Sequence, residues 1–187
     1  MDEHTAGWLC PFLPSSMVRI RRLVEMLALT ESDHVLDIGA GNGAALIEVA
    51  RLTGCTCTGV ELDQGLVEEA REAAAALGLG DRCRFVCGDA TKVVVAPSEA
   101  SGQGEGCVHV ATVTVVLLYL IPSALVALEE VVRGVMARGS SARLCTLVYH
   151  YRNVAYDQAD PDFNIAIMDS GEPFRGTGRR SVARCVL

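Results

Sequence analysis

Basic residues are scarce in this sequence, and lysine occurs only once, as Lys92. The 187 residues contain 16 Lys and Arg against 23 Asp and Glu, which gives a formal net charge of −7. A protein that binds nucleic acid mainly through phosphates usually carries a basic surface, so this composition disfavours a nucleic-acid partner. Arg19, Arg21 and Arg22 form an early basic cluster, which we interpret as the solvated face of a helix, with partner binding as the alternative.

Metal-binding and disulfide patterns are also lacking. The eight cysteines are scattered and include no C-x-x-C pair, whereas zinc sites need ligands at close, repeated spacings. We therefore expect no metal site, and we interpret the cysteines as small buried side chains in a reducing compartment.

Neither a secretory signal nor a membrane span is visible in the sequence. The N-terminus has no basic segment followed by an apolar core, and Asp2 and Glu3 disfavour a mitochondrial presequence. The longest apolar run, residues 108–121, is shorter than the roughly 20 residues that cross a bilayer. These absences favour an intracellular, cytoplasmic protein.

Strand-like and helix-like patterns alternate along the chain. This rhythm implies parallel strands joined by right-handed crossovers. We predict an α/β fold of the Rossmann-like, doubly wound type, with a mostly parallel sheet and helices on both faces, in a single domain over residues 1–187. The predicted strands are residues 34–38, 56–60, 82–87, 110–118 and 143–148, and the predicted helices are residues 16–29, 44–52, 64–77 and 123–137.

The C-terminal part, residues 151–187, has a less regular pattern than the recognisable core at residues 16–150. Residues 163–168 and 181–187 are the only strand candidates that we find in this part. Because the pattern between them is irregular, we expect the C-terminal strands to be incomplete. Residues 96–106 are rich in Pro, Ser, Gly and Glu, which predicts a surface loop.

A glycine-rich segment, Val-Leu-Asp-Ile-Gly-Ala-Gly-Asn-Gly at residues 35–43, carries the strongest functional pattern. Its glycines allow a tight turn and let a ligand approach the backbone closely. The helix that follows offers unpaired N–H groups and a positive dipole end to a phosphate, or to the carboxylate of an amino-acid ligand. Residues 39–44 also satisfy the looser dinucleotide pattern G-x-G-x-x-[GA], so the turn alone leaves both ligands open.

Acidic residues lie at the carboxyl ends of three predicted strands. Asp37 precedes the first glycine by two residues, Glu61 ends the second strand, and Asp89 follows the third. Ligands of doubly wound sheets bind outside these strand ends. A carboxylate at Glu61 can accept both hydroxyls of a ribose, and one at Asp89 can accept the exocyclic amine of adenine. Together the acids predict a nucleoside site, although each one alone also fits a solvated loop residue or a helix cap.

These motifs resemble those of the class I S-adenosylmethionine-dependent methyltransferases. The resemblance implies S-adenosylmethionine as the cofactor, with the glycine turn at its methionine part, the second-strand acid at the ribose and the third-strand acid at the adenine. It also implies that Asp37 shapes the turn and faces the methionine amine. The implied cofactor-binding residues are Asp37, Gly39, Gly41, Gly43, Glu61, Leu62, Asp89 and Ala90.

A narrower resemblance covers roughly residues 11–150. Residues 11–16, Pro-Phe-Leu-Pro-Ser-Ser, and residues 116–122, Val-Leu-Leu-Tyr-Leu-Ile-Pro, are similar to the group that includes the ATP synthase c-subunit lysine N-methyltransferase. This resemblance implies that the acceptor is a lysine amine and that the partner is a protein.

Tyr119, at the carboxyl end of the fourth predicted strand, is our candidate for lining the acceptor channel. Because a sulfonium already activates the methyl group, the protein mainly positions the nucleophile. A lysine must arrive neutral, which a desolvating channel favours by lowering its pKa, and an aromatic ring can stabilise a cationic methyl or amine. A structural tyrosine in the core or at the rim is the alternative.

Two other functional classes remain open from the sequence. A nicotinamide-dependent oxidoreductase uses the same kind of turn, but no Ser, Tyr and Lys set follows, since Lys92 is the only lysine. A module that binds the cofactor without turnover is the other class, because the C-terminal third has no recognisable match to the methyltransferases.

Overall fold

The computed structural model describes residues 16–92, 108, 110–138, 142–152, 154–169 and 182–184. Residues 11–15 of the proline-containing motif and the predicted loop at residues 96–106 lie outside the described residues. The helices are α1 (Met17–Leu27), α2 (Ala44–Thr53), α3 (Gln64–Ala76) and α4 (Pro122–Arg138), with 3-10 turns η2 (Ala90–Lys92) and η3 (Val110–Thr112). The strands are β1 (His34–Ile38), β2 (Thr56–Glu61), β3 (Cys83–Cys87), β4 (Val115–Leu118), β5 (Arg143–Leu147), β6 (Tyr149–Tyr151), β7 (Gln158–Asp160), β8 (Ile165–Met168) and β9 (Val182–Arg184).

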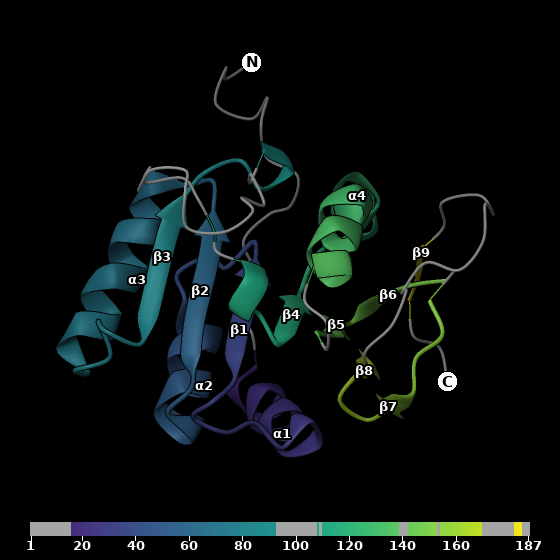
Figure 1. The fold of residues 1–187 in the computed structure, drawn as a ribbon, viewed down its shortest axis with the longest axis horizontal. Coiled ribbons are helices and arrows are strands. Elements are labelled where there is room, and N and C mark those ends of the chain that lie inside the picture. The colour runs from purple at the N-terminus through teal and green to yellow at the C-terminus, as the bar shows by residue number, and fades with distance from the viewer. Residues whose placement is uncertain are drawn as a thin grey trace.

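Seven of these strands form one sheet in the order β3-β2-β1-β4-β5-β8-β7 (Figure 1). Strands β1 to β5 are parallel, whereas β8 runs antiparallel to β5 and β7 antiparallel to β8. Strands β2 and β3 lie on one side of β1, and β4 and β5 lie on its other side. The strand order thus reverses between β1 and β4, and ligands of such sheets bind outside the carboxyl ends of the strands at this point. The predicted mostly parallel, doubly wound sheet is confirmed.

The C-terminal strands differ in detail from the prediction. The candidates at residues 163–168 and 181–187 are strands only over Ile165–Met168 and Val182–Arg184, and β9 pairs with β6 in a separate two-stranded sheet. Strands β6 and β7 have three residues each, which is too short to produce a recognisable alternation of apolar and polar residues.

Helices cover both faces of the sheet, as expected (Figure 1). On one face Val35 and Leu117 pack with α1, α2 and α3, and on the other Leu36 and Val116 pack with α4. Neighbouring residues of one strand thus enter different cores, which explains why the strands are apolar at nearly every position.

The arginine cluster of α1 is more than a solvated face. The Nε atom of Arg21 lies 2.9 Å from a carboxylate oxygen of Glu48 on α2, and Nε of Arg22 lies 2.7 Å from one of Asp160 on β7. Arg19 donates from Nε to the backbone carbonyl of Phe163 at 2.6 Å. The side chains of Arg21 and Arg22 are 57% and 41% exposed, as a solvated face requires, and the three arginines in addition attach α1 to α2 and to the hairpin of β7 and β8.

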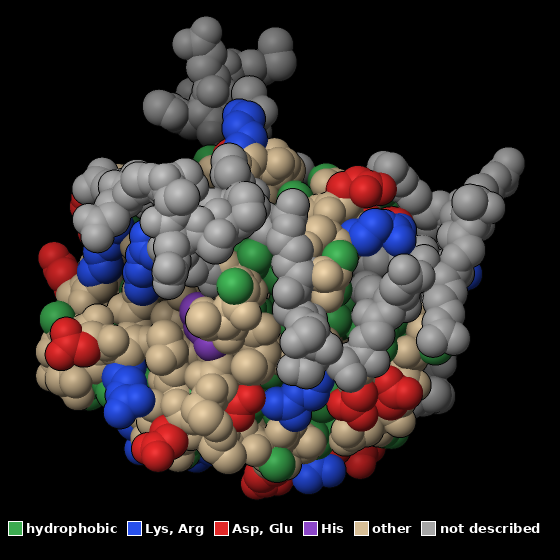
Figure 2. All heavy atoms as spheres, viewed as in Figure 1, with side chains coloured by type: hydrophobic (Ala, Val, Ile, Leu, Met, Phe, Trp, Pro, Cys, Tyr) green, Lys and Arg blue, Asp and Glu red, His purple; other side chains and the backbone are tan. Residues whose placement is uncertain are grey.

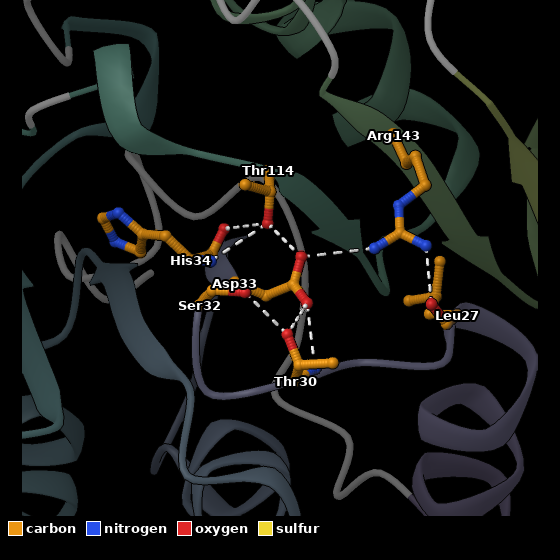
Figure 3. Close-up of polar contacts among 7 residues, drawn as sticks. All are labelled: Leu27, Thr30, Ser32, Asp33, His34, Thr114 and Arg143. Atoms are coloured by element: carbon orange, nitrogen blue, oxygen red, sulfur yellow. Dashed lines mark hydrogen bonds and ion pairs between the residues drawn. The ribbon is translucent and has the colours of Figure 1, made fainter.

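A polar network joins the amino ends of the central strands (Figure 3). The carboxylate of Asp33 accepts hydrogen bonds from the backbone N–H of Thr30 at 2.9 Å and from the hydroxyl of Thr114 at 2.8 Å. Arg143 lies 3.4 Å from Asp33 and donates to the carbonyl of Leu27 at 2.6 Å. The network ties β1, β4 and β5 to the end of α1, at the edge opposite the predicted site, so we assign it a structural role.

The described cysteines are free thiols, and Cys55, Cys57, Cys83 and Cys145 among them are buried, as the sequence analysis expected of small apolar side chains. Within the described ranges, no group of His, Cys, Asp and Glu is arranged to hold a metal ion. None of the helices in the described part of the chain has the length and apolar character needed to cross a membrane.

Candidate functional site

The glycine turn connects β1 to α2 at the carboxyl edge of the sheet. Gly39, Gly41 and Gly43 have φ angles of 90°, 56° and 73°, a region that L side chains rarely adopt. The N–H groups of Gly39 and Ala40 both donate to the carbonyl of Val60, at 2.9 and 3.0 Å. The turn is therefore attached to the end of β2, the strand that carries Glu61.

Two of the glycines are also needed for packing inside the protein. A Cβ atom at Gly43 would lie 2.5 Å from Cζ of Phe85 and 2.8 Å from Cβ of Ala70, and one at Gly39 would lie 2.8 Å from Cδ2 of Leu120. Gly43 is the N-cap of α2, so its small size lets this helix start close against β3 and α3. Both glycines are thus required by the fold, in addition to any role towards a ligand.

Glu61 is fixed at the tip of β2 by three backbone N–H groups. Its Oε2 accepts from Gly41 at 2.8 Å, and its Oε1 accepts from Leu62 at 2.7 Å and from Asp63 at 3.1 Å. The structure therefore brings Glu61 and the glycine turn into direct contact, as the motif spacing predicted. Leu62 is 41% exposed, which leaves an apolar side chain at the surface beside this carboxylate.

Asp37 lies in β1 and is only 5% exposed. Its Oδ1 atom is buried and has no hydrogen-bond partner in the described structure. Burial, followed by the charge of Glu61, raises the pKa of Asp37 to about 7. A buried oxygen without a donor is costly, so it indicates a place for a donor from a ligand.

Asp89 lies at the tip of β3, beside β2, where the N–H of Gly88 donates to the carbonyl of Glu61 at 2.8 Å. Its Oδ1 accepts from the hydroxyl of Thr91 at 2.6 Å, and its Oδ2 lies 3.0 Å from Nζ of Lys92. These contacts, with the Thr91 hydroxyl first, lower the pKa of Asp89. The Asp89 carboxylate thus directly precedes η2, the turn that contains Ala90, and is held by two of its residues.

Tyr119 follows β4 directly and lies at the same edge as the glycine turn, since its neighbour Leu120 approaches Gly39. It is half-buried, and the guanidinium carbon of Arg19 lies 5.9 Å from the centre of its ring. That distance is within the range of a cation–π contact. No local pattern predicts this contact, because Arg19 and Tyr119 come from elements that are distant along the chain.

A buried polar cluster connects β5 to the residues that follow it, and the sequence did not predict how its members pair. The hydroxyl of Thr146 lies 2.5 Å from Nδ1 of His150 and 3.3 Å from the hydroxyl of Tyr156, which accepts from the backbone of Tyr151 at 3.0 Å. Burial lowers the pKa of His150 to about 4, so the ring is neutral at physiological pH. The hydroxyl of Tyr151 donates to the carbonyl of Leu125 at 2.7 Å, so the cluster holds β6 against α4.

The charge distribution agrees with the acidic composition. On the face shown in Figure 2, the described basic side chains are interspersed with acidic ones. The described arginines of α1 are engaged with Glu48, Asp160 and the Phe163 carbonyl. Neither observation favours an extended phosphate-binding surface.

Comparison with known sequences identifies relatives for part of the chain. The profile of the family described as "Methyltransferase domain" matches residues 35–139, more than half of the chain. Over 71 residues the chain is 37% identical to the sterol 4-C-methyltransferase strm-1 of Caenorhabditis elegans, covering 38% of this chain and 21% of that protein. Over 81 residues it is 32% identical to the ribosomal protein L11 methyltransferase of an Exiguobacterium species, covering 43% of this chain and 25% of that protein. The match thus spans about a fifth to a quarter of the length of these curated relatives.

Comparison with solved structures gives the same fold. The crystal structure of an RNA methyltransferase from Salinibacter ruber in complex with S-adenosyl-L-homocysteine is similar with a TM-score of 0.68, over 89% of this chain and 97% of that one. The sequence identity is 22%, so this likeness is one of fold. On the profile match to its sequence, and in agreement with its sheet topology, the chain belongs to the methyltransferase domain family.

Proposed function

We propose that the chain binds S-adenosylmethionine and transfers its methyl group to a lysine amine of a protein. One observation carries the cofactor part of the proposal: the unpartnered, buried Oδ1 of Asp37 belongs to the strand that leads into a glycine turn in contact with Glu61. A ligand with an ammonium group and a ribose satisfies both carboxylates at once. S-adenosylmethionine carries both groups.

The residues at the carboxyl edge fit such a ligand. Glu61 is positioned to accept the ribose hydroxyls, because three backbone bonds already fix its orientation. Leu62 offers an apolar surface to the adenine ring, and Asp89 with Ala90 offers polar recognition of its edge. The glycine turn, Gly39 to Gly43, presents the start of α2 to the carboxylate of the methionine part.

The chemistry that remains for the protein is positioning. When bound, the cofactor would supply a methyl group on a sulfonium: the amine lone pair would form the new C–N bond, and the thioether would leave with the electrons of the C–S bond. Tyr119 directly follows β4, the strand paired with β1, and we assign its ring to orienting the acceptor and excluding water. A desolvated position there favours the neutral amine, which alone has a lone pair for the attack.

The acceptor is the finer part of the proposal. The segment from Val116 to Pro122, which contains Tyr119, supports a lysine through its resemblance to the lysine methyltransferase group. The net charge of −7 also favours encounter with a basic protein over an acidic one. Relatives named for sterols and for a ribosomal protein show that the family by itself does not fix the acceptor.

The experiment incubates the protein with labelled S-adenosylmethionine and a cell extract, and then measures both S-adenosylhomocysteine and the fraction that carries the label. Label in protein, recovered as methyl-lysine after digestion, supports the proposal. Label in lipid or RNA would overturn the lysine assignment and keep the methyltransferase. Binding of S-adenosylmethionine without any turnover would favour the module that binds cofactor and has lost catalysis.

A further inference from the structure

The buried carboxyl group of Asp37 has an environment that no other described acid shares. Asp37 is 5% exposed, its Oδ1 has no hydrogen-bond partner, and its strand neighbours are Gly59 on β2 and Leu117 on β4, neither of which carries a polar side chain. A charged carboxylate in such a place has an oxygen, Oδ1, that neither water nor a described donor reaches, which makes ionisation costly.

The charged groups around Asp37 make ionisation harder still. The titratable groups that interact with it in the described structure are Glu61 on β2, which adds negative charge, and the buried thiol of Cys145 on β5. On the helices that cover this face, Arg21 and Arg51 pair with Glu48.

The remaining arginines of α1 are engaged elsewhere, Arg22 with Asp160 and Arg19 with the Phe163 carbonyl. Among the described residues, no cation is therefore paired with Asp37.

We propose that Asp37 holds a proton in the free protein and releases it to solvent when a ligand ammonium group binds beside it, so that cofactor binding and proton release are coupled. This rests on the proposed function, because the ammonium is that of the methionine part. The O–H bond of the Asp37 carboxyl group breaks, its electrons stay on the carboxylate, and the proton passes to the buffer.

The coupling follows from the charges that the two states contain. Without ligand, the negative charge of Glu61 opposes ionisation of Asp37 on the adjacent strand, and no cation of the described residues pairs with Asp37, so its carboxyl group stays neutral at lower cost. The ammonium group supplies the missing positive charge and the missing donor for Oδ1. Ionised Asp37 is then the favoured form.

The size of the effect follows from the pKa of Asp37, which is about 7 in the free protein. If the bound form is fully ionised, affinity falls as the pH drops through this value, and the Kd at pH 6 is about fivefold larger than at pH 7. At pH 6.5 about three quarters of a proton is released per ligand bound. The ligand amine keeps its proton over this interval, since α-amino groups titrate at about 7.7–8.0.

Isothermal titration calorimetry tests the coupling with S-adenosylhomocysteine at pH 6, 6.5 and 7, in pairs of buffers that differ in ionisation enthalpy. The difference in binding heat between the two buffers gives the number of protons released. 5′-Methylthioadenosine is the matched ligand, because it keeps the nucleoside and the thioether but has no amino-acid part. We expect proton release and the fivefold change in Kd with the first ligand, and neither with the second.

Asp37→Asn is the matched protein variant, since it keeps the shape of the side chain but cannot titrate. It should bind S-adenosylhomocysteine more weakly and with the same Kd at pH 6 and pH 7. If both ligands bind the unmodified protein and neither releases protons, the coupling is overturned while the proposed function stands. If neither ligand binds at any pH, the proposed function itself fails and the coupling with it.

Discussion

Glu61 and Asp63 are two carboxylates separated by one residue, and the structure gives them different tasks. Glu61 holds the glycine turn through the N–H of Gly41 at 2.8 Å and faces the proposed ribose position. Asp63 is the N-cap of α3, where its Oδ1 accepts from Gly65 at 2.7 Å and from Leu66 at 3.1 Å. The variants Glu61→Ala and Asp63→Ala should therefore separate cofactor binding from helix capping.

The expected magnitudes differ in both measurements. Losing two hydrogen bonds from ribose hydroxyls to a charged group, at about 1.5–3 kcal/mol each, should raise the Kd for S-adenosylhomocysteine at least about a hundredfold in Glu61→Ala. The same variant should lose roughly 1.5–3 kcal/mol of unfolding free energy without ligand, because the partly buried N–H of Gly41 is left without its acceptor. Asp63→Ala should lose about 1 kcal/mol of stability, as other N-caps do, with a change in Kd of less than about threefold.

Urea denaturation without ligand measures the stabilities, and calorimetry at a temperature where both variants are folded measures the affinities. Equal losses of affinity in the two variants would refute the assignment of Glu61 to the ribose. An unchanged urea midpoint in Glu61→Ala would show instead that the hydrogen bonds of Glu61 to the glycine turn do not contribute to the free energy of unfolding.

Three further predictions concern the acceptor side, the amino edge and the glycine turn. Tyr119→Ala should reduce the rate of methyl transfer at least about tenfold while leaving the Kd for the cofactor nearly unchanged. This is the result expected of a contact made only with the acceptor or in the transition state. An unaltered rate of methyl transfer in a folded variant would contradict the prediction. Asp33→Asn should destabilise the protein by about 1 kcal/mol at pH 7. Burial raises the pKa of Asp33, but hydrogen bonds from Thr30 and Thr114 and the charge of Arg143 outweigh it, so the pKa is lowered in the folded state. That difference in unfolding free energy should shrink as the pH falls below about 4, where the unfolded carboxyl is protonated and the folded one follows, and a gap that widens in acid would argue against it. Gly43→Ala should lower the free energy of unfolding by about 2–4 kcal/mol without any ligand, because the added Cβ meets Phe85 at 2.5 Å. Gly78→Ala is the control: its φ of 68° is similar but no atom lies within 4 Å, so it should lose only about 1 kcal/mol through backbone strain. Equal urea midpoints for the two variants would exclude the steric effect.

Local patterns in the sequence predicted the elements that a short window can encode. The strands β1 to β5 are apolar runs, the helices have apolar residues at helical spacing, and the glycines mark the turn between β1 and α2. Because the carboxyl ends of parallel strands meet at one edge, the position of Glu61 at a strand end was enough to predict its proximity to the glycine turn. The profile match and the sheet order then agree with the family that these motifs resembled.

The sequence did not predict which distant side chains meet. Arg19 and Phe163, or Asp33 and Arg143, are separated by 144 and 110 residues, and nothing in their local patterns pairs them. The antiparallel placement of β8 beside β5, and the short strands β6 and β7, also depend on contacts that form only once the sheet exists. For this reason the sequence predicted the solvated face of α1 but not the contacts through which its basic cluster attaches the helix.

The properties of the three acidic residues at the site also depend partly on local sequence and partly on the folded structure. The sequence by itself determined that Asp37, Glu61 and Asp89 lie at strand ends around a glycine turn, because strand periodicity and glycine geometry are local properties. Only the tertiary structure decided that Asp37 is buried without a partner for Oδ1 and that Glu61 accepts from Gly41, whereas Asp89 pairs with Lys92 through a local contact three residues along the chain. The pKa of a carboxyl group depends on burial and on charges brought near it in space, so three identical functional groups became three different ones only when the chain folded.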